Sequence, residues 1–288
     1  MILGHQKQWQ YLKKLAELDK LPHALLFCGQ EKLGKKTLAL EFIKWLFGED
    51  IEKKPHPDFI FIEPTKREIQ ISQTRELIWK LSLKPSVAHF KAAVINEAHC
   101  LNQEAQSSLL KILEEPKGNA ILILITEYPE ALLPTILSRV QKIKFQPVKK
   151  IEIENYLKEQ GVKENERMEI LEISEGKPGR AMDLIREPAK LKERGEKIKE
   201  LVKILNSDLI LRFQYAKTIS EDAEISKEAL DIWLSYFRKI FLKKCLTPDI
   251  KQADKLKNII KLCQKTNFLI STTNVNLRLA LEILMLEL

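Results

Sequence analysis

The most constraining feature of the sequence is a series of four short apolar runs in its first half, each separated from the next by a segment with helical periodicity. The runs occupy residues 23–28, 58–62, 91–96 and 120–126. Uninterrupted apolar runs of this length are typical of strands buried on both faces, and their alternation with helices is typical of a parallel sheet. The sequence therefore predicts an α/β domain whose parallel sheet is covered by helices on both sides.

The helical segments divide the chain further. Between the strands, apolar residues recur at helical spacing in residues 5–19, 35–47, 72–83 and 102–113, with Ser72 as the expected N-cap of the third helix. After Pro147 the strand-like runs stop, and helices are expected at 151–160, at 165–175, from Arg180 to about Pro188, and from 190 to the end. We therefore predict three domains, at 1–148, 149–189 and 190–288.

Composition excludes several classes of protein. The four cysteines include no CxxC pair, so neither a zinc knuckle nor a disulfide framework is expected. No apolar run reaches the roughly 18 residues of a membrane span, and the N-terminus lacks a signal pattern, which predicts a cytoplasmic protein without a membrane partner. The net charge is +8, and the basic stretch 238–265 is interpreted as a solvated helix face in preference to a DNA-binding patch.

One loop has the pattern of a phosphate-binding P-loop. The sequence GQEKLGK at residues 29–35 follows an expected strand and precedes an expected helix. In this context Gly29 and Gly34 let backbone N–H groups turn inward, the helix N-terminus favours anions, and Lys35 can reach a β- or γ-phosphate. The pattern predicts P-loop ancestry.

The magnesium side of this loop departs from the pattern. Lys36 stands where a Ser or Thr hydroxyl would bind Mg²⁺, and Thr37 lies one residue, or about 100° of helix, further on. The strand 91–96 ends in Asn96 where an aspartate would organise the metal, although Glu97 remains in the position that polarises water. The sequence predicts a site that handles Mg²⁺ badly and does not hydrolyse ATP, and it leaves open whether ATP or ADP still binds.

Several longer motifs carry a family resemblance. They are HALL at 23–26, ISQTREL at 71–77, AQSSLLKILEEP at 105–116, PTILSRVQ at 134–141, GKPGRA at 176–181 and NVNLRLALE at 274–282. With these motifs the chain resembles the delta-prime family of bacterial DNA polymerase III clamp-loader subunits, which are AAA+ proteins. The resemblance implies a RecA-like AAA+ parallel-sheet domain, a small helical lid domain and an all-α C-terminal collar domain.

The resemblance also implies roles for individual residues. Arg139 matches the arginine that clamp-loader subunits place against a neighbour's ATP, although a pair with a carboxylate at the domain edge is the alternative. Thr126 matches the sensor 1 position, and the alternative is that it only caps or forms the strand. Arg180 matches the sensor 2 position, and the alternative is that it only begins a helix. Val140 replaces the family's cysteine, and residues 45–60 lack the cysteine module of many relatives, so no zinc is expected.

The function implied is that of a non-motor, stator-like subunit that is not catalytic alone and takes part in DNA-directed DNA polymerase activity through the holoenzyme. Its expected partners are gamma/tau-type and delta-type subunits, with the sliding clamp and primed DNA reached through the complex. An ATP-hydrolysing gamma/tau-type subunit, a non-replicative AAA+ regulator and a P-loop small-molecule kinase are the alternatives. Intact magnesium ligands would favour the first, and absence of a helical terminal domain would favour the last.

Overall fold

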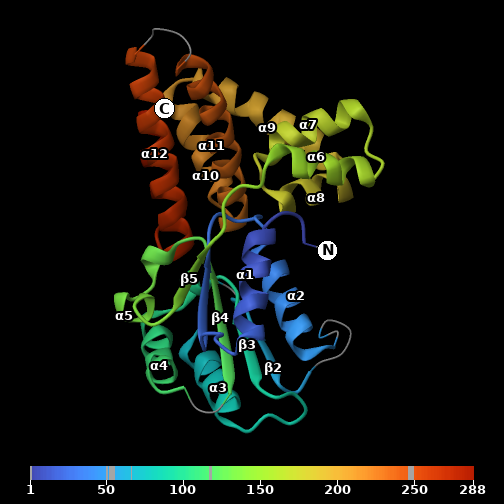
Figure 1. Cartoon of the computed structure of the whole chain (residues 1–288). Helices are drawn as coiled ribbons and strands as arrows, with labels where there is room; N and C mark the ends of the chain where they lie inside the picture. The colour runs from blue at the N-terminus through green and yellow to red at the C-terminus, as the bar shows by residue number, and fades with distance from the viewer. Residues whose placement is uncertain (1, 50, 52–55, 66, 117–118, 246–249) are drawn as a thin grey trace. The chain divides into compact units, whose positions relative to one another are not determined.

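The computed structural model describes residues 2–49, 51, 56–65, 67–116, 119–245 and 250–288, and these pack as two compact units, residues 1–183 and 184–288 (Figure 1). The first unit contains α1 (Gln6–Glu17), β1 (Ala24–Cys28), α2 (Lys35–Phe47), β2 (Phe59–Ile62), α3 (Ile71–Ser82), β3 (Lys91–Ile95), η1 (Ala98–Cys100), α4 (Gln103–Glu114), β4 (Ala120–Thr126), η2 (Pro129–Ala131), α5 (Pro134–Leu137), β5 (Gln141–Lys144), α6 (Lys150–Glu159) and α7 (Glu164–Ser174). The helix α8 (Pro178–Arg186) spans the boundary between the units.

The strands form one parallel sheet in the order β2-β3-β4-β1-β5. Four of them confirm the apolar runs of the sequence. The fifth, β5, was not predicted, because in its sequence QKIK only Ile143 is buried and an edge strand needs no continuous apolar run. The interior strand β1, between β4 and β5, is buried along its whole length, which explains why all five of its residues are apolar.

Helices cover both faces of the sheet, and Figure 1 shows α1 and α2 on one side with α3 and α4 on the other. On the first side Leu12, Phe42 and Ile43 pack against alternate residues of β1 and β4. On the second side Leu77, Leu109 and Ile136 pack against the intervening residues. This arrangement confirms the predicted α/β layers and leaves the carboxyl ends of the strands to carry a site.

Two predicted helix starts are corrected. The N-cap of α3 is Gln70, not Ser72, since Gln70 and Gln73 form a reciprocal capping box that leaves Ser72 inside the first turn. The helix expected to open at Arg180 begins at Pro178, a residue that suits a first helical turn because it needs no intrahelical N–H bond.

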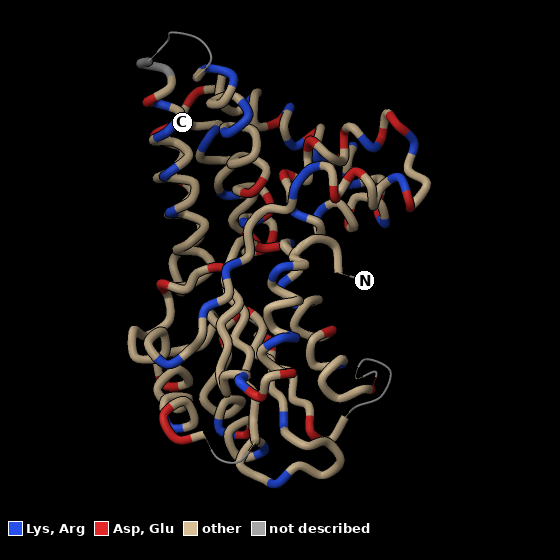
Figure 2. The backbone as a smooth tube through the Cα atoms, in the orientation of Figure 1, with Lys and Arg blue, Asp and Glu red and all other residues tan. Residues whose placement is uncertain are grey.

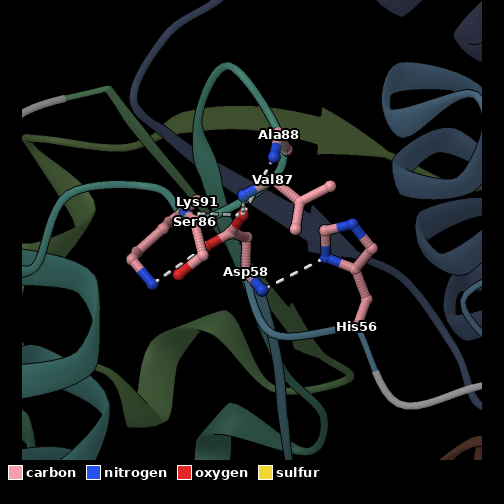
Figure 3. Close-up of polar contacts among 6 residues, drawn as sticks. All are labelled: His56, Asp58, Ser86, Val87, Ala88 and Lys91. Carbon is pink, nitrogen blue, oxygen red and sulfur yellow. Dashed lines mark hydrogen bonds and ion pairs between the residues drawn. The ribbon is translucent and has the colours of Figure 1, made fainter.

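A buried ion pair ties together the amino ends of β2 and β3 (Figure 3). The Asp58 carboxylate is fully buried and accepts the backbone N–H groups of Ser86, Val87 and Ala88 at 2.8–3.0 Å, as well as the Lys91 ammonium at 3.1 Å. Burial alone would raise the pKa of this carboxyl, but these hydrogen bonds hold its pKa well below the usual range. Asp58 therefore orders the loop that leads into β3.

The second unit is entirely helical in its described part. It contains α9 (Ala189–Leu205), α10 (Leu209–Ile219), α11 (Ala223–Cys245), α12 (Ile250–Thr272) and α13 (Leu277–Glu287). Trp233 and Phe237 of α11 lie in a core with Cys263, Leu281 and Leu284. The helical character predicted after residue 190 agrees with these elements, whereas the division of the chain into three domains stays a prediction.

Charge is spread over the surface in both signs. Figure 2 shows Lys and Arg interspersed with Asp and Glu along α6 to α9. Part of the basic stretch 238–265 lies at residues 246–249, outside the described residues. Over the described ranges, no helix combines the length and the hydropathy that a membrane crossing requires.

Candidate nucleotide site

The P-loop has the predicted setting between β1 and α2. Gly34 caps α2 with a φ of 87°, and Gly29 has a φ of 150°. A Cβ on Gly29 would lie 2.4 Å from the backbone oxygen of Phe145, so only glycine fits at this point of the loop. The first glycine of the motif is thus required by its close approach to the segment after β5, a strand that the motif itself does not reveal.

Replacing Gly29 by alanine is expected to destabilise the chain by on the order of 2 kcal/mol or more, because the clash is with backbone and the φ is unfavourable. Gly195→Ala in α9 is the matched control, since a Cβ there meets nothing within 4 Å and alanine favours helix by about 0.5–1 kcal/mol. Urea unfolding of both variants measures the difference. Equal stability of the two would contradict a tight contact at Gly29.

Lys35 is buried inside this loop. Its Nζ donates hydrogen bonds to the backbone oxygens of Gly29 at 2.6 Å and Gln30 at 2.5 Å. Burial lowers the pKa of Lys35 to about 8, against the opposing effect of Glu127 and Glu31. The lysine is therefore held on the loop's own carbonyl groups, in the position from which the motif predicts a phosphate contact.

Lys36, at the magnesium-ligand position, is turned toward the end of β2. Its Nζ lies 3.0 Å from Oε2 of Glu63 and 4.6 Å from the ring centroid of Phe61. Thr37 is exposed on the next position of α2. A cation paired with a carboxylate therefore occupies the place in sequence where a hydroxyl ligand would stand, and such a cation repels Mg²⁺.

Three of the predicted residues follow β3 or end β4 at the same edge of the sheet. Asn96 directly follows β3, and its backbone N–H bonds the oxygen of Ile62 at 2.8 Å. Glu97 is exposed and has a φ of 52°. Thr126 ends β4 and is buried, with its Oγ1 accepting the N–H of Tyr128 at 3.0 Å. Parallel pairing brings these positions to the edge that also carries the P-loop.

The segment 176–183 contacts the P-loop through residues other than the one predicted. The N–H of Gly179 donates to the backbone oxygen of Lys32 at 2.8 Å, and the Lys32 ammonium lies 2.9 Å from the Asp183 carboxylate. Arg180 instead donates to the backbone oxygen of Ile173 at 3.4 Å and lies 3.7 Å from Glu175. Its sensor 2 role stays a prediction.

Sequence reasoning missed two residues that line the loop. Glu127 follows Thr126, and its pKa is raised by burial and by Glu31, while Lys35 and Lys177 oppose the shift. His5 bonds the backbone oxygen of Leu33 through Nε2 at 2.8 Å, and burial lowers its pKa. An acidic residue directly after a buried strand was the available signal for Glu127, whereas nothing local to His5 indicated a contact 28 residues away.

Arg139 lies after α5, beside the end of α4. Its guanidinium forms an ion pair with Glu114 at 2.8 Å and donates to the backbone oxygen of Thr135 at 2.9 Å. About a third of its side chain is exposed, and half of that of Glu114 is (35% and 51%). Exposed pairs of this kind contribute only about 0.2–1 kcal/mol, so the pair with Glu114 can be exchanged for another anion.

Comparison with known proteins identifies the chain's relatives. The model of the family described as DNA polymerase III, delta subunit, matches residues 4–149, which include the P-loop, Thr126 and Arg139. The chain belongs to this family. The DNA polymerase III subunit delta' of Bacillus subtilis is 37% identical over 160 residues, which are 51% of this chain and 49% of the relative. The family resemblance predicted from the motifs is thereby confirmed, although the match spans about half the length of that relative.

Two further proteins resemble this chain over more of its length. The replication factor C small subunit of Methanococcus maripaludis is 26% identical over 83% of this chain and 81% of its own. The structure of a DNA polymerase III gamma subunit-related protein from Thermotoga maritima superposes with a TM-score of 0.55 and 21% identity, covering 96% of this chain and 97% of the other. The predicted RecA-like AAA+ domain with C-terminal helices is confirmed as the fold class.

Proposed function

We propose that this chain is a non-motor subunit of a bacterial DNA polymerase III clamp loader, which supports DNA replication without hydrolysing ATP itself. The observation that carries the proposal is the Lys36–Glu63 pair, which stands where a family member that hydrolyses ATP needs a magnesium ligand. Asn96 in place of an aspartate acts in the same direction. Since both changes affect the metal and leave the P-loop backbone intact, the site keeps its shape without its catalytic ion.

The proposed role is that of a stator. The chain presents Arg139 to ATP held by an adjacent gamma/tau-type subunit, and a guanidinium in that position stabilises charge on the transferring phosphoryl group. ATP binding by those neighbours opens the sliding clamp and places it on primed DNA. The chain contributes geometry and one arginine to the holoenzyme's DNA-directed DNA polymerase activity.

The last helix offers a surface for joining other loader subunits. Leu279, Ile283 and Leu286 of α13 are each about half exposed (55%, 49% and 58%). Their spacing of four and three residues places them on one helix face, while Leu281 and Leu284 face the core of the second unit. Apolar side chains gathered on one exposed face mark protein interaction sites, which supports the predicted collar role of this helix.

A purified chain incubated with ATP and Mg²⁺ is expected to show no turnover above that of its Lys35→Ala variant, because the ion has no adequate ligands. Mixed with gamma/tau-type and delta-type subunits, it is expected to co-elute with them in size-exclusion chromatography. Ile283→Asp in α13 is expected to lower the affinity for the other subunits at least tenfold, seen as loss of co-elution. Its unfolding temperature is expected to stay within a few degrees of wild type.

Steady ATP turnover that Lys35→Ala abolishes would sink the stator role and favour the ATP-hydrolysing gamma/tau-type subunit. Failure of the wild-type chain to join the loader would favour the non-replicative AAA+ regulator. The matched control for Ile283→Asp is Ile225→Asp, which places the same charge on an exposed isoleucine of α11 (49%) and is expected to leave assembly unchanged.

A further inference from the structure

Three side chains with metal-binding atoms converge just after β3. Glu97, His99 and Cys100 each offer one ligand atom, and these atoms all lie within 4.8 Å of one another. His99 and Cys100 are buried, whereas Glu97 is exposed. Within the described residues, no other group of three or more potential metal ligands comes this close together.

Local backbone geometry explains why these residues meet. Glu97 has a left-handed backbone with a φ of 52° and precedes η1, a single turn of 3₁₀-helix. The N–H of Cys100 closes the turn on the oxygen of Glu97 at 2.8 Å. Side chains at positions i and i+3 eclipse in such a turn, which brings the Cys100 sulfur to 4.0 Å from Oε2 of Glu97.

The His99 ring is held in a fixed orientation beside this pair. Its Nδ1 lies 3.2 Å from Oγ1 of Thr126, and its ring meets that of Tyr128 edge to face with centroids 5.2 Å apart. Thr126 is itself fixed at the end of β4, where it accepts the N–H of Tyr128. Histidines that bind metals are commonly oriented in this way by a hydrogen bond to the ring.

We propose that Glu97, His99 and Cys100 form a three-ligand site for zinc, with the fourth position open to water. One thiolate, one imidazole and one carboxylate form a donor set that zinc accepts, whereas magnesium prefers oxygen ligands. Zinc ligands lie about 2.0–2.3 Å from the ion, hence roughly 3.3–3.7 Å from one another in a tetrahedron. Atoms already within 4.8 Å reach that geometry by side-chain movements of about 1 Å.

Charge and access also fit a zinc ion. The carboxylate and the thiolate together neutralise its two positive charges, which is needed beside two buried ligands. On binding, the Cys100 sulfur exchanges its proton for the metal, and the proton passes to solvent. The exposed Glu97 provides the route by which the ion enters from water. The competing interpretation is structural, with the Cys100 thiol donating to Glu97 and no affinity for metal.

The test uses the whole chain, with Co²⁺ as a spectroscopic probe of the site. Every protein tested carries Cys245→Ser, which removes an exposed thiol that could bind the metal. Titration is expected to saturate at one Co²⁺ per chain with a near-ultraviolet thiolate-to-cobalt absorption band, and Zn²⁺ is expected to displace the cobalt. Cys100→Ser is expected to abolish the band, while Cys263→Ser, a buried thiol in the other unit, leaves it intact.

Two milder variants keep the test decisive if Cys100→Ser perturbs folding. Glu97→Gln keeps the shape of an exposed side chain and is expected to weaken Co²⁺ binding at least tenfold, and Thr126→Val removes the bond to His99 and is expected to cost about tenfold. Thermal unfolding of each metal-free variant checks that its fold is retained. Absence of saturable binding to the parent chain, a band that persists in folded Cys100→Ser, or an unchanged Co²⁺ affinity in folded Glu97→Gln would overturn the proposal.

Discussion

Asp58→Asn is expected to lower the free energy of unfolding by about 3–5 kcal/mol, one of the largest effects available in this chain. The substitution leaves the Lys91 ammonium buried (6% exposed) opposite a neutral amide, and an uncompensated buried charge costs about that much. It also removes a charged acceptor of the N–H groups of Ser86, Val87 and Ala88. Urea unfolding monitored by circular dichroism measures the loss.

The matched control for Asp58→Asn is Glu76→Gln, which breaks the exposed pair between Glu76 and Lys80 on α3. Such helical pairs contribute only about 0.3–0.5 kcal/mol. Adding Lys91→Met to Asp58→Asn is expected to restore part of the lost stability, because the unpaired charge is removed. A cost for Asp58→Asn no larger than that of Glu76→Gln would show that this ion pair does not stabilise the loop.

The contribution of Asp58 also has a defined dependence on pH. Its pKa in the folded chain lies well below its value in the unfolded chain, about 3.9. The stabilisation is therefore fully present above about pH 4–5 and declines as the pH falls from there toward the folded-state pKa. The stability difference between wild type and Asp58→Asn is expected to be constant near neutral pH and to shrink in acid.

Arg139→Ala is expected to reduce ATP hydrolysis at the neighbouring subunit's site by about 10³-fold or more, as in other systems where an arginine is supplied in trans. The expectation rests on the proposed loader role. DNA-stimulated ATPase of the reconstituted loader measures it, with assembly confirmed by co-elution. Arg139→Lys is expected to lose much of the rate as well, because an ammonium lacks the planar fork of donors.

Glu114→Gln separates this role from a purely structural one. It removes the 2.8 Å ion pair with Arg139 but keeps the guanidinium. If Arg139 acts on a neighbour's ATP, Glu114→Gln preserves or raises the rate, since the arginine no longer has to leave a carboxylate. If Arg139 only pairs with Glu114, neither variant changes ATP hydrolysis, and both lower stability by the same small amount.

Uniform local patterns explain which parts of the fold could be predicted. The bounds of α2 agree with the sequence because a glycine borders each of its ends. The bounds of β4 agree because its apolar run is continuous. The strand β5 was not predicted, because it lies at the edge of the sheet and only Ile143 of its four residues is buried. Capping by Gln70 depends on a side-chain bond that its residue type only weakly indicates.

The site was predictable where a motif is contiguous and not where packing assembles it. The setting of Lys35 follows from its strand–loop–helix context, whereas the Gly179 contact with Lys32 joins segments far apart in the chain. The group at residues 97–100 escaped for another reason. A search for paired cysteines does not detect a single cysteine that meets a histidine and a glutamate through a 3₁₀ turn.

The strand order has a consequence for synthesis on the ribosome. The fully apolar β1 pairs only with β4 and β5, which begin about a hundred residues later, so none of its sheet hydrogen bonds can form until those strands emerge. At a synthesis rate of about 5–20 residues per second, β1 stays without its partner strands for roughly 5–20 seconds. Nascent chains that end before Thr126 therefore carry β1 as an apolar segment without a sheet partner, which exposes it to association with other chains.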